Sequence, residues 1–253
     1  MTVKYQKLTL KMEDSGGIMK ANTPSDICAQ WEMIPIGAVH MEVMRFLLFS
    51  SLEWLALFIL TFAMFKFPYR GFWGQLILCS FLLSLLSYVL FDVLNMRPVA
   101  PAFQLPLVIL CTWQIFRVHL FYAAIVTTYG YVAYSFLQSL YILVWKISGF
   151  TFEETLALPN GYYLQYLTIL SALIIGWVIY KRRLGFTFVP DFEHVRVEFR
   201  GINLWLLVLV ILGNLQVASY SLIAQRSVET VFLSGVVLLV LLYFARKKEY
   251  SHD

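Results

Sequence analysis

From Met44 onward the sequence is a succession of long apolar runs, and few charged residues interrupt them. A helix that crosses a bilayer needs about 20 mostly apolar residues, because the hydrocarbon core is roughly 30 Å thick and each residue rises about 1.5 Å. Charged residues make up only 13% of the chain, whereas an ordinary soluble domain carries about 25%. This number of charged residues is too small to cover the surface of a soluble fold of this length. The sequence therefore indicates a membrane protein.

Seven of these runs are long enough, or nearly long enough, to cross a bilayer. Their expected bounds are Met44–Phe65, Gly74–Leu94, Val99–Phe116, His119–Trp145, Tyr162–Tyr180, Ile202–Ala224 and Val228–Ala245. The runs are continuously apolar and do not alternate as barrel strands do, so each is expected to be a helix. The sequence therefore predicts an all-α, polytopic transmembrane helix bundle with seven spans, or six if the short run at residues 99–116 is re-entrant.

Basic residues in the short loops predict the orientation of the bundle, because cytoplasmic loops carry an excess of Lys and Arg. We expect the protein to lie in the cell membrane. With seven spans or with six, this bias then predicts that the loop of residues 181–200 and the C-terminus face the cytoplasm. The basic residues of that loop are Lys181, Arg182, Arg183, Arg196 and Arg200. Contact with anionic lipid headgroups explains such a loop, and so does docking of a partner protein.

The two ends of the chain differ from the apolar region. Residues 1–43 show no sustained periodicity and no secretory signal, so we expect a disordered tail, or an N-terminal extension ahead of a natural start at Met41 or Met44. Residues 44–248 are expected to form the transmembrane helical domain. Residues 249–253 then form a short cytoplasmic tail.

Glu53 is an acidic residue near the middle of the first predicted span. An ionisable side chain at that depth is costly, and it usually faces the interior of a bundle, a partner or a water-filled cavity. We therefore consider it a candidate for binding a ligand or a proton. The alternative is a neutral, hydrogen-bonded carboxylic acid that locks two helices together.

The span from His119 to Trp145 carries a stripe of polar and aromatic side chains. Tyr131, Tyr134 and Gln138 follow one another at steps of three and four residues, so they share one helical face. This pattern is typical of a helix that lines a ligand cleft, and equally of hydroxyl groups that bond to neighbouring helices. Asn214 lies near the centre of a later span and is the other candidate, although amides such as Gln165 and Asn214 also serve as packing contacts between helices.

The motifs of several common enzyme classes are missing from the sequence. It contains no HExxH metal motif, no GxSxG nucleophile motif and no GxxxxGK[ST] phosphate loop. The three cysteines have no CxxC spacing, and we expect Cys79 and Cys111 to act as small apolar residues. We therefore expect no enzymatic activity, no catalytic residue, no metal, no cofactor and no nucleic-acid partner.

Several apolar phrases of the sequence are similar to those of a bacterial receptor family. They are LEWLALFILTFAMFKF beginning at Leu52, then SYVLFDVL, FRVHLFYA and YKRRLG. With the number and spacing of the spans, residues 44–248 resemble the N-terminal polytopic sensor region of histidine kinases of the accessory-gene-regulator, peptide-pheromone receptor type. In that family the membrane region receives an extracellular signal, and a cytoplasmic kinase follows it.

The resemblance implies a sensor without its kinase part, because only residues 249–253 follow the final basic stretch. The sequence then predicts a free-standing signal-sensing input module that acts through a separately encoded kinase or another membrane protein. Two other functions stay open: a small permease or membrane subunit of a transporter, and a structural partner in a membrane complex. Internal repeats, which are common in transporters, are not evident between the two halves of the chain.

Overall fold

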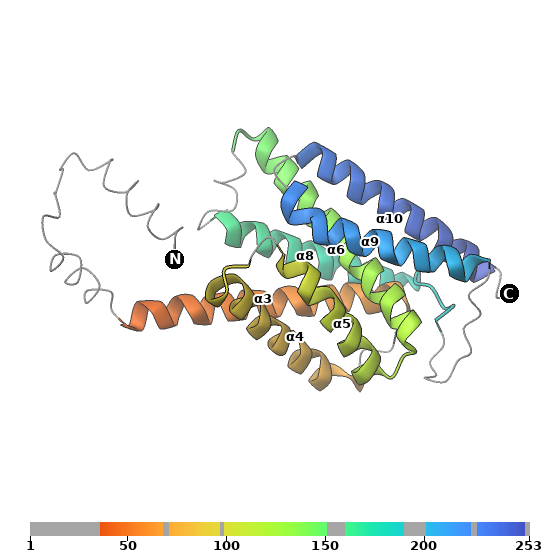
Figure 1. Cartoon of the computed structure of the whole chain (residues 1–253), viewed down its shortest axis with the longest axis horizontal. Coiled ribbons are helices and arrows are strands. Elements are labelled where there is room, and N and C mark those ends of the chain that lie inside the picture. Colours follow the sequence, from red (N-terminus) through yellow and green to blue (C-terminus); the bar gives the residue numbers. More distant parts are fainter. Residues whose placement is uncertain are drawn as a thin grey trace, which may run out of the picture. The chain divides into compact units, whose positions relative to one another are not determined.

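The computed structural model describes residues 36–67, 71–96, 99–150, 160–189, 201–223 and 227–250. Within these ranges the chain is helical and contains no strand, which confirms the predicted all-α class. A helix occupies each of the seven predicted apolar runs (Figure 1). The helices are α3 (Ile36–Met64), α4 (Trp73–Tyr88) with its π-helical continuation η2 (Val89–Val93), α5 (Ala100–Phe116), α6 (Leu120–Ile147), α8 (Asn160–Arg182), α9 (Ile202–Ile223) and α10 (Ser227–Tyr250).

The chain divides into two compact units, Met1–Phe46 and Leu47–Asp253. Helix α3 runs through the division, and everything below concerns the second unit. The predictions for residues 1–35, including the disordered tail, lie outside the described residues. Helix α3 already begins at Ile36, ahead of the expected span start at Met44.

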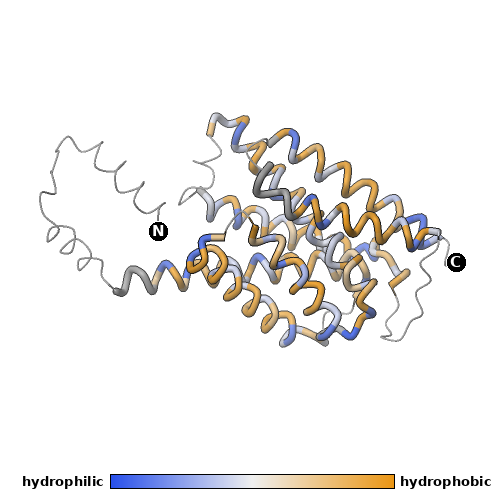
Figure 2. Tube along the Cα trace, viewed as in Figure 1, coloured by the Kyte–Doolittle hydropathy of each residue, from blue (hydrophilic) through white to orange (hydrophobic). Residues whose placement is uncertain are grey.

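Five of the helices are long and apolar enough to cross a membrane: α3, α4 with η2, α6, α8 and α10. Helix α9 has a shorter apolar stretch over its fully described residues, Ile202–Val217. Helix α5 is one continuous helix of 17 residues, about 25 Å long at 1.5 Å per residue. The apolar surfaces of these helices are compatible with a multi-pass membrane protein in contact with lipid (Figure 2), while the count of seven spans stays a prediction.

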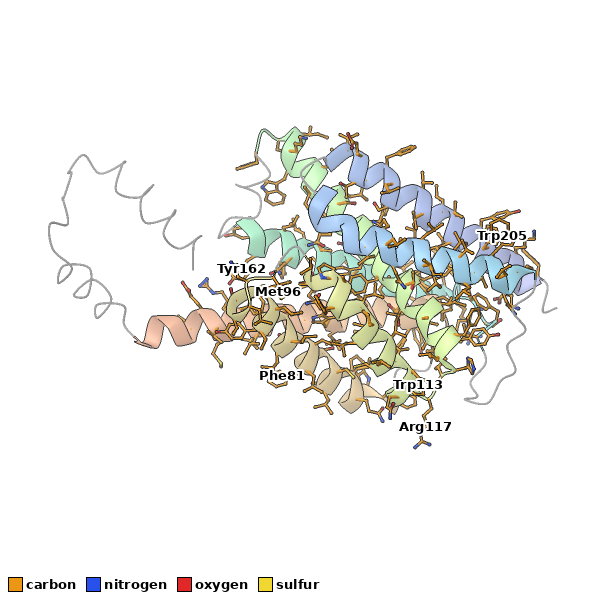
Figure 3. The ribbon with its side chains drawn as sticks, in the orientation of Figure 1. Phe81, Met96, Trp113, Arg117, Tyr162 and Trp205 are labelled. Carbon is orange, nitrogen blue, oxygen red and sulfur yellow. The ribbon has the colours of Figure 1, made fainter. Side chains whose placement is uncertain are left out.

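Only three residues, Arg117 to His119, connect α5 with α6. Arg117 ends α5 with a left-handed backbone conformation (φ 53°), and its side chain extends away from the helices (Figure 3). His119 then begins α6, because its Nδ1 accepts a hydrogen bond from the backbone N–H of Phe121 at 3.2 Å. A side chain that caps the first turn satisfies a backbone donor that the helix itself leaves unpaired.

Helix α6 packs against α5, α8, α9 and α10 and also contacts α3, and most of its side chains are buried. Tyr129 is fully buried and its hydroxyl donates to the backbone carbonyl of Leu241 on α10. On its α3 side, Gly130 leaves room for Thr61, which a Cβ atom at residue 130 would strike. A polar bond to another helix at Tyr129 and a small residue at Gly130 are both typical of close helix packing in a membrane.

Helices α3, α8 and α10 end at the same end of this unit, which we call the basic end. The backbone N–H of Phe186, just after α8, donates to the carbonyl of Met64 on α3 at 2.7 Å. The next residue, Thr187, donates from its backbone N–H to the carboxylate of Glu249 on α10 at 2.8 and 3.1 Å. The basic residues here are Lys66, Lys181, Arg182, Arg183, Arg246, Lys247 and Lys248.

Candidate functional site: a polar cluster around Glu53

The carboxyl group of Glu53 lies where α3 meets α6 and α8. Its Oε2 accepts a hydrogen bond from Nε2 of Gln165 on α8 at 3.2 Å. The hydroxyl of Tyr134 on α6 lies close enough to interact with the same carboxyl group, and the phenol group of Tyr131 is near enough to be affected by its charge. We call these four residues the Glu53 cluster. It brings together three of the residues that the sequence singled out, Glu53, Tyr131 and Tyr134, from helices far apart along the chain.

The hydroxyl of Tyr134 is the group in the cluster that lacks a well-formed hydrogen bond. It is buried, and in the part of the chain that the structure describes no partner meets the distance and angle of a good hydrogen bond. Leaving a buried polar group without a hydrogen bond costs about 1–3 kcal/mol. The hydroxyl lies near the Glu53 carboxyl without the geometry of a well-formed hydrogen bond, so this part of the cluster is incompletely bonded.

A second set of polar contacts adjoins the Glu53 cluster and is centred on Ser87 of α4. The Ser87 hydroxyl accepts from Nε2 of Gln104 at 2.9 Å and from Nε1 of Trp54 at 3.3 Å, and donates to the carbonyl of Leu83 at 2.8 Å. Gln104 in turn receives a long contact of 3.5 Å from the hydroxyl of Tyr131. Tyr131 therefore belongs to both sets, and its ring also lies 5.8 Å from that of Trp54.

The position of the Glu53 cluster along the bundle follows from how α3 lies beside α8. Near the start of α8, the ring of Tyr162 lies 5.1 Å from that of Phe49 on α3. Glu53 is about 6 Å further along α3 than Phe49, and about 20 Å before Lys66, at 1.5 Å per residue. The cluster therefore lies nearer the end of the unit opposite the basic end, although Glu53 is central in the apolar stretch Met41–Met64 when α3 is considered alone.

The remaining predicted site residues lie apart from the Glu53 cluster. Gln138 is half-buried on α6, and no hydrogen bond joins it to Glu53 among the described residues. Asn214 on α9 accepts a hydrogen bond from the hydroxyl of Thr128 at 3.1 Å and so connects α9 with α6. Lys181, Arg182 and Arg183 are exposed at the end of α8. Arg196 and Arg200 lie outside the described residues.

Four residues of the two polar sets were not predicted as site residues. Gln104 and Gln165 were among several amides interpreted as packing contacts, and neither Trp54 nor Ser87 was singled out. Trp54 carried a usable signal, because an indole N–H buried in an apolar span needs a hydrogen-bond acceptor. A serine within an apolar helix gives no comparable signal, since its hydroxyl can bond to its own helix, as Ser87 does to Leu83.

Metal-ligand chemistry finds no support in the described ranges, where no three His, Cys, Asp or Glu side chains gather. The thiols of Cys79 on α4 and Cys111 on α5 are free and lie within hydrogen-bonding reach of each other. Comparison of the chain with protein-family models, curated proteins and solved structures finds no match.

Proposed function

We propose that this multi-pass membrane protein is a signal-sensing input module of the cell membrane whose Glu53 cluster receives the signal and which acts through a partner protein. The observation that carries the proposal is the Glu53–Gln165 hydrogen bond beside the buried hydroxyl of Tyr134, which lacks a well-formed hydrogen bond. A partly buried polar set that contains an acid and an incompletely bonded hydroxyl is suited to accept a proton or a small polar ligand. Binding there changes contacts on α3, α6 and α8 together.

The electrostatics of the Glu53 carboxyl group support a responsive site. Its neighbours in the cluster, Gln165, Tyr131 and Tyr134, are uncharged side chains. A charged carboxylate among uncharged groups in an apolar bundle is costly, so gain or loss of a proton, or arrival of a cation, changes the local free energy strongly. The rearrangement that follows is transmitted through the helices that hold the carboxyl group.

The position of the cluster favours input from outside the cell. By the positive-inside rule, the basic end faces the cytoplasm, and the Glu53 cluster lies toward the opposite end. A signal from outside would cross only a short depth to reach it. Helices α3 and α8 then run from the cluster to the basic end, where a kinase or another membrane protein would receive the output, as the resemblance to receptor histidine kinases implies.

Trp54 offers a local test, because it follows Glu53 and its ring contacts Tyr131. The fluorescence of Trp54, taken as the difference between the protein and its Trp54→Phe variant in vesicles, should change with external pH. The change should vanish in Glu53→Gln and persist in Glu229→Gln, which removes an exposed acid on α10. A pH response that survives Glu53→Gln would refute the assignment of Glu53 as the receiving group.

The competing function is transport, and the specific observation in its favour is the adjacency of the Ser87 contacts to the Glu53 cluster. Together they place polar groups on α3, α4, α5, α6 and α8 within an apolar bundle. A pH-sensitive dye enclosed in the same vesicles distinguishes the two functions. A transporter would pass protons in response to a gradient and lose this flux in Glu53→Gln, whereas a sensor would show the Trp54 response without flux.

A further inference from the structure

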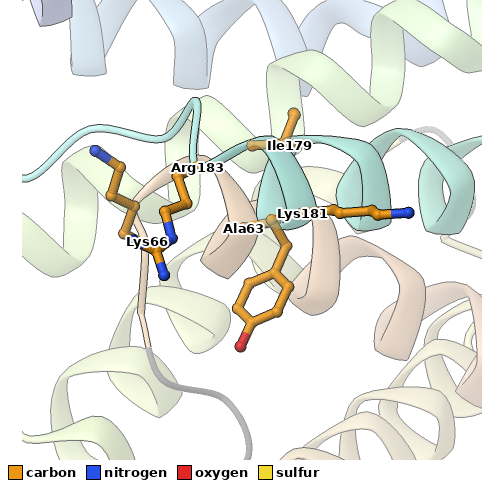
Figure 4. A pocket seen from close by; sticks show the side chains of 6 residues that line it. Ala63, Lys66, Ile179, Lys181 and Arg183 are labelled. Atoms are coloured by element: carbon orange, nitrogen blue, oxygen red, sulfur yellow. The ribbon is translucent and has the colours of Figure 1, made fainter.

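A cavity of about 390 Å³ lies at the basic end, between the end of α3 and the end of α8. Its lining residues are Ala63, Lys66, Ile179, Tyr180, Lys181 and Arg183. Three of these six side chains are cationic and none is acidic. Lys66 and Arg183 lie side by side at one edge of the cavity (Figure 4). We propose that this cavity binds the phosphate of an anionic phospholipid headgroup.

The usual role of basic residues at helix ends does not account for Lys66 and Arg183. Cations near the last turn commonly bond to the unpaired terminal carbonyls, but backbone groups already do this here. On α3, the carbonyls of Phe62, Ala63 and Met64 accept from the N–H groups of Phe67, Lys66 and Phe186. On α8, the carbonyls of Ile179 and Tyr180 accept from Leu184 and Arg183. Bonding to these terminal carbonyls therefore does not explain why Lys66 and Arg183 are basic.

The backbone at the two cationic positions points to the same conclusion. Lys66 and Arg183 both adopt the left-handed conformation, with φ of 52° and 54°. This conformation favours glycine after a helix end, because other residues have a steric cost there. The residue at each of these helix ends instead has a long basic side chain that lines the cavity. Within the described ranges, no acidic side chain forms an ion pair with either of them.

The surroundings of the cavity are typical of the level of lipid headgroups. Nζ of Lys181 lies 4.8 Å from the ring centre of Trp177, which is exposed. Trp and Tyr gather at the boundary between hydrocarbon and water, and lysine side chains extend toward the headgroups there. The exposed apolar side chains Ile174, Ile175 and Val178 precede the cavity on α8. A bound lipid would lay its acyl chains along this surface and its phosphate between Lys66 and Arg183.

Close backbone contact holds the two sides of the cavity together. A Cβ atom on Gly185 would lie 2.6 Å from the carbonyl oxygen of Ala63 and 2.8 Å from that of Met64. The segment after α8 can therefore approach the end of α3 only with glycine at this position. This contact fixes the separation of Lys66 and Arg183, which pre-organises them for a phosphodiester.

The test measures thermal unfolding of the full chain in a neutral detergent. The chain is titrated with dioctanoyl phosphatidylglycerol, with dioctanoyl phosphatidylcholine, or with inorganic phosphate. A ligand that binds only the folded state raises the midpoint temperature, by an amount that grows with the logarithm of its concentration relative to Kd. We expect stabilisation by phosphatidylglycerol alone. The double variant Lys66→Gln/Arg183→Gln should bind it about 30-fold more weakly, as expected for two basic residues at an anionic headgroup.

The matched control is Arg246→Gln/Lys247→Gln, which removes two exposed cations at the same end and should keep the response. Equal loss in both double variants would show a diffuse charge effect and overturn the proposal. So would an undiminished response in Lys66→Gln/Arg183→Gln, or stabilisation by inorganic phosphate as large as by the lipid. If that variant does not fold, Ile179→Trp decides, because it fills the cavity and keeps every cation. Retention of the full lipid response in Ile179→Trp would reject the site.

Discussion

Gln165 on α8 donates a hydrogen bond from Nε2 to Oε2 of Glu53 on α3 at 3.2 Å, across 112 residues of sequence. The bond joins two helices that both end at the basic end, and it lies well away from that end. It is the contact that turns Glu53 from an isolated acid in an apolar run into part of a polar cluster.

A double-mutant cycle on Glu53→Ala and Gln165→Ala measures this contact. The coupling free energy should be about 0.6–2 kcal/mol, the range of hydrogen bonds between membrane helices. Reversible unfolding in detergent gives the four free energies of unfolding that the cycle requires. The pair Gln165→Ala and Tyr243→Phe serves as the control and should be additive, because Tyr243 is exposed on α10. Additivity of the Glu53 and Gln165 variants as well would contradict the hydrogen bond.

Two buried tyrosines of α6 should respond differently to loss of their hydroxyl groups. Tyr129→Phe removes a donor to the Leu241 carbonyl and should lower the free energy of unfolding by about 1–2 kcal/mol. Tyr134→Phe removes a hydroxyl without a well-formed bond, so it should leave stability unchanged or raise it. The unfolding midpoints of the two variants provide the comparison. A loss in Tyr134→Phe as large as in Tyr129→Phe would mean that Tyr134 donates a strong bond to Glu53.

The contact between α3 and α6 at Gly130 should not tolerate a methyl group. A Cβ atom there would lie 1.7 Å from Oγ1 and 2.8 Å from Cβ of Thr61, and the Thr61 hydroxyl is already bonded to the carbonyl of Leu57. Gly130→Ala should therefore destabilise the protein by about 1–3 kcal/mol. Thermal unfolding should show substantial rescue by Thr61→Ala in the same chain.

Gly74→Ala is the matched control for Gly130→Ala, because nothing lies within 4 Å of a Cβ atom at Gly74 on α4. It should be neutral or slightly stabilising, by up to about 1 kcal/mol, since alanine is the better helix former. If both glycine variants lose stability equally, the close approach of α6 to α3 is wrong.

Cysteine cross-linking tests the pairing of α4 with α5. The thiols of Cys79 and Cys111 face each other, so oxidation by copper phenanthroline and oxygen in a Cys28→Ser background should form an intramolecular disulfide. Intact mass after alkylation would show one product that resists the alkylating reagent, and reduction would restore both thiols. The Cys79→Ser variant should give none of it. Cross-linked dimers alone would argue against this arrangement of α4 and α5.

The helices of this protein could be predicted from the sequence because their cause is local. A run of apolar residues that is long enough to cross a bilayer has to satisfy its backbone within itself, and charged residues such as Lys66 and Arg183 mark where the run stops. Tyr131 and Tyr134 were likewise placed on one face by their spacing, and the structure brings both to Glu53.

The partners of those residues could not be predicted in the same way. In a soluble helix the buried face is more apolar than the exposed face, but lipid is as apolar as a protein interior. The pattern along α8 therefore could not show that Gln165 faces α3, nor the pattern along α9 that Asn214 faces Thr128. Similarly, the depth of Glu53 in the bundle depends on where α8 begins beside α3.

The sequence by itself determined that this chain forms apolar helices, where most of them end, and which end of the helices carries the excess of basic residues. Only the tertiary structure decided that Glu53 meets Gln165 and Tyr134, and that Lys66 and Arg183 line one cavity. The physical reason is that helix formation depends on neighbours along the chain. The meeting of two side chains from different helices depends instead on packing contacts that no single segment encodes.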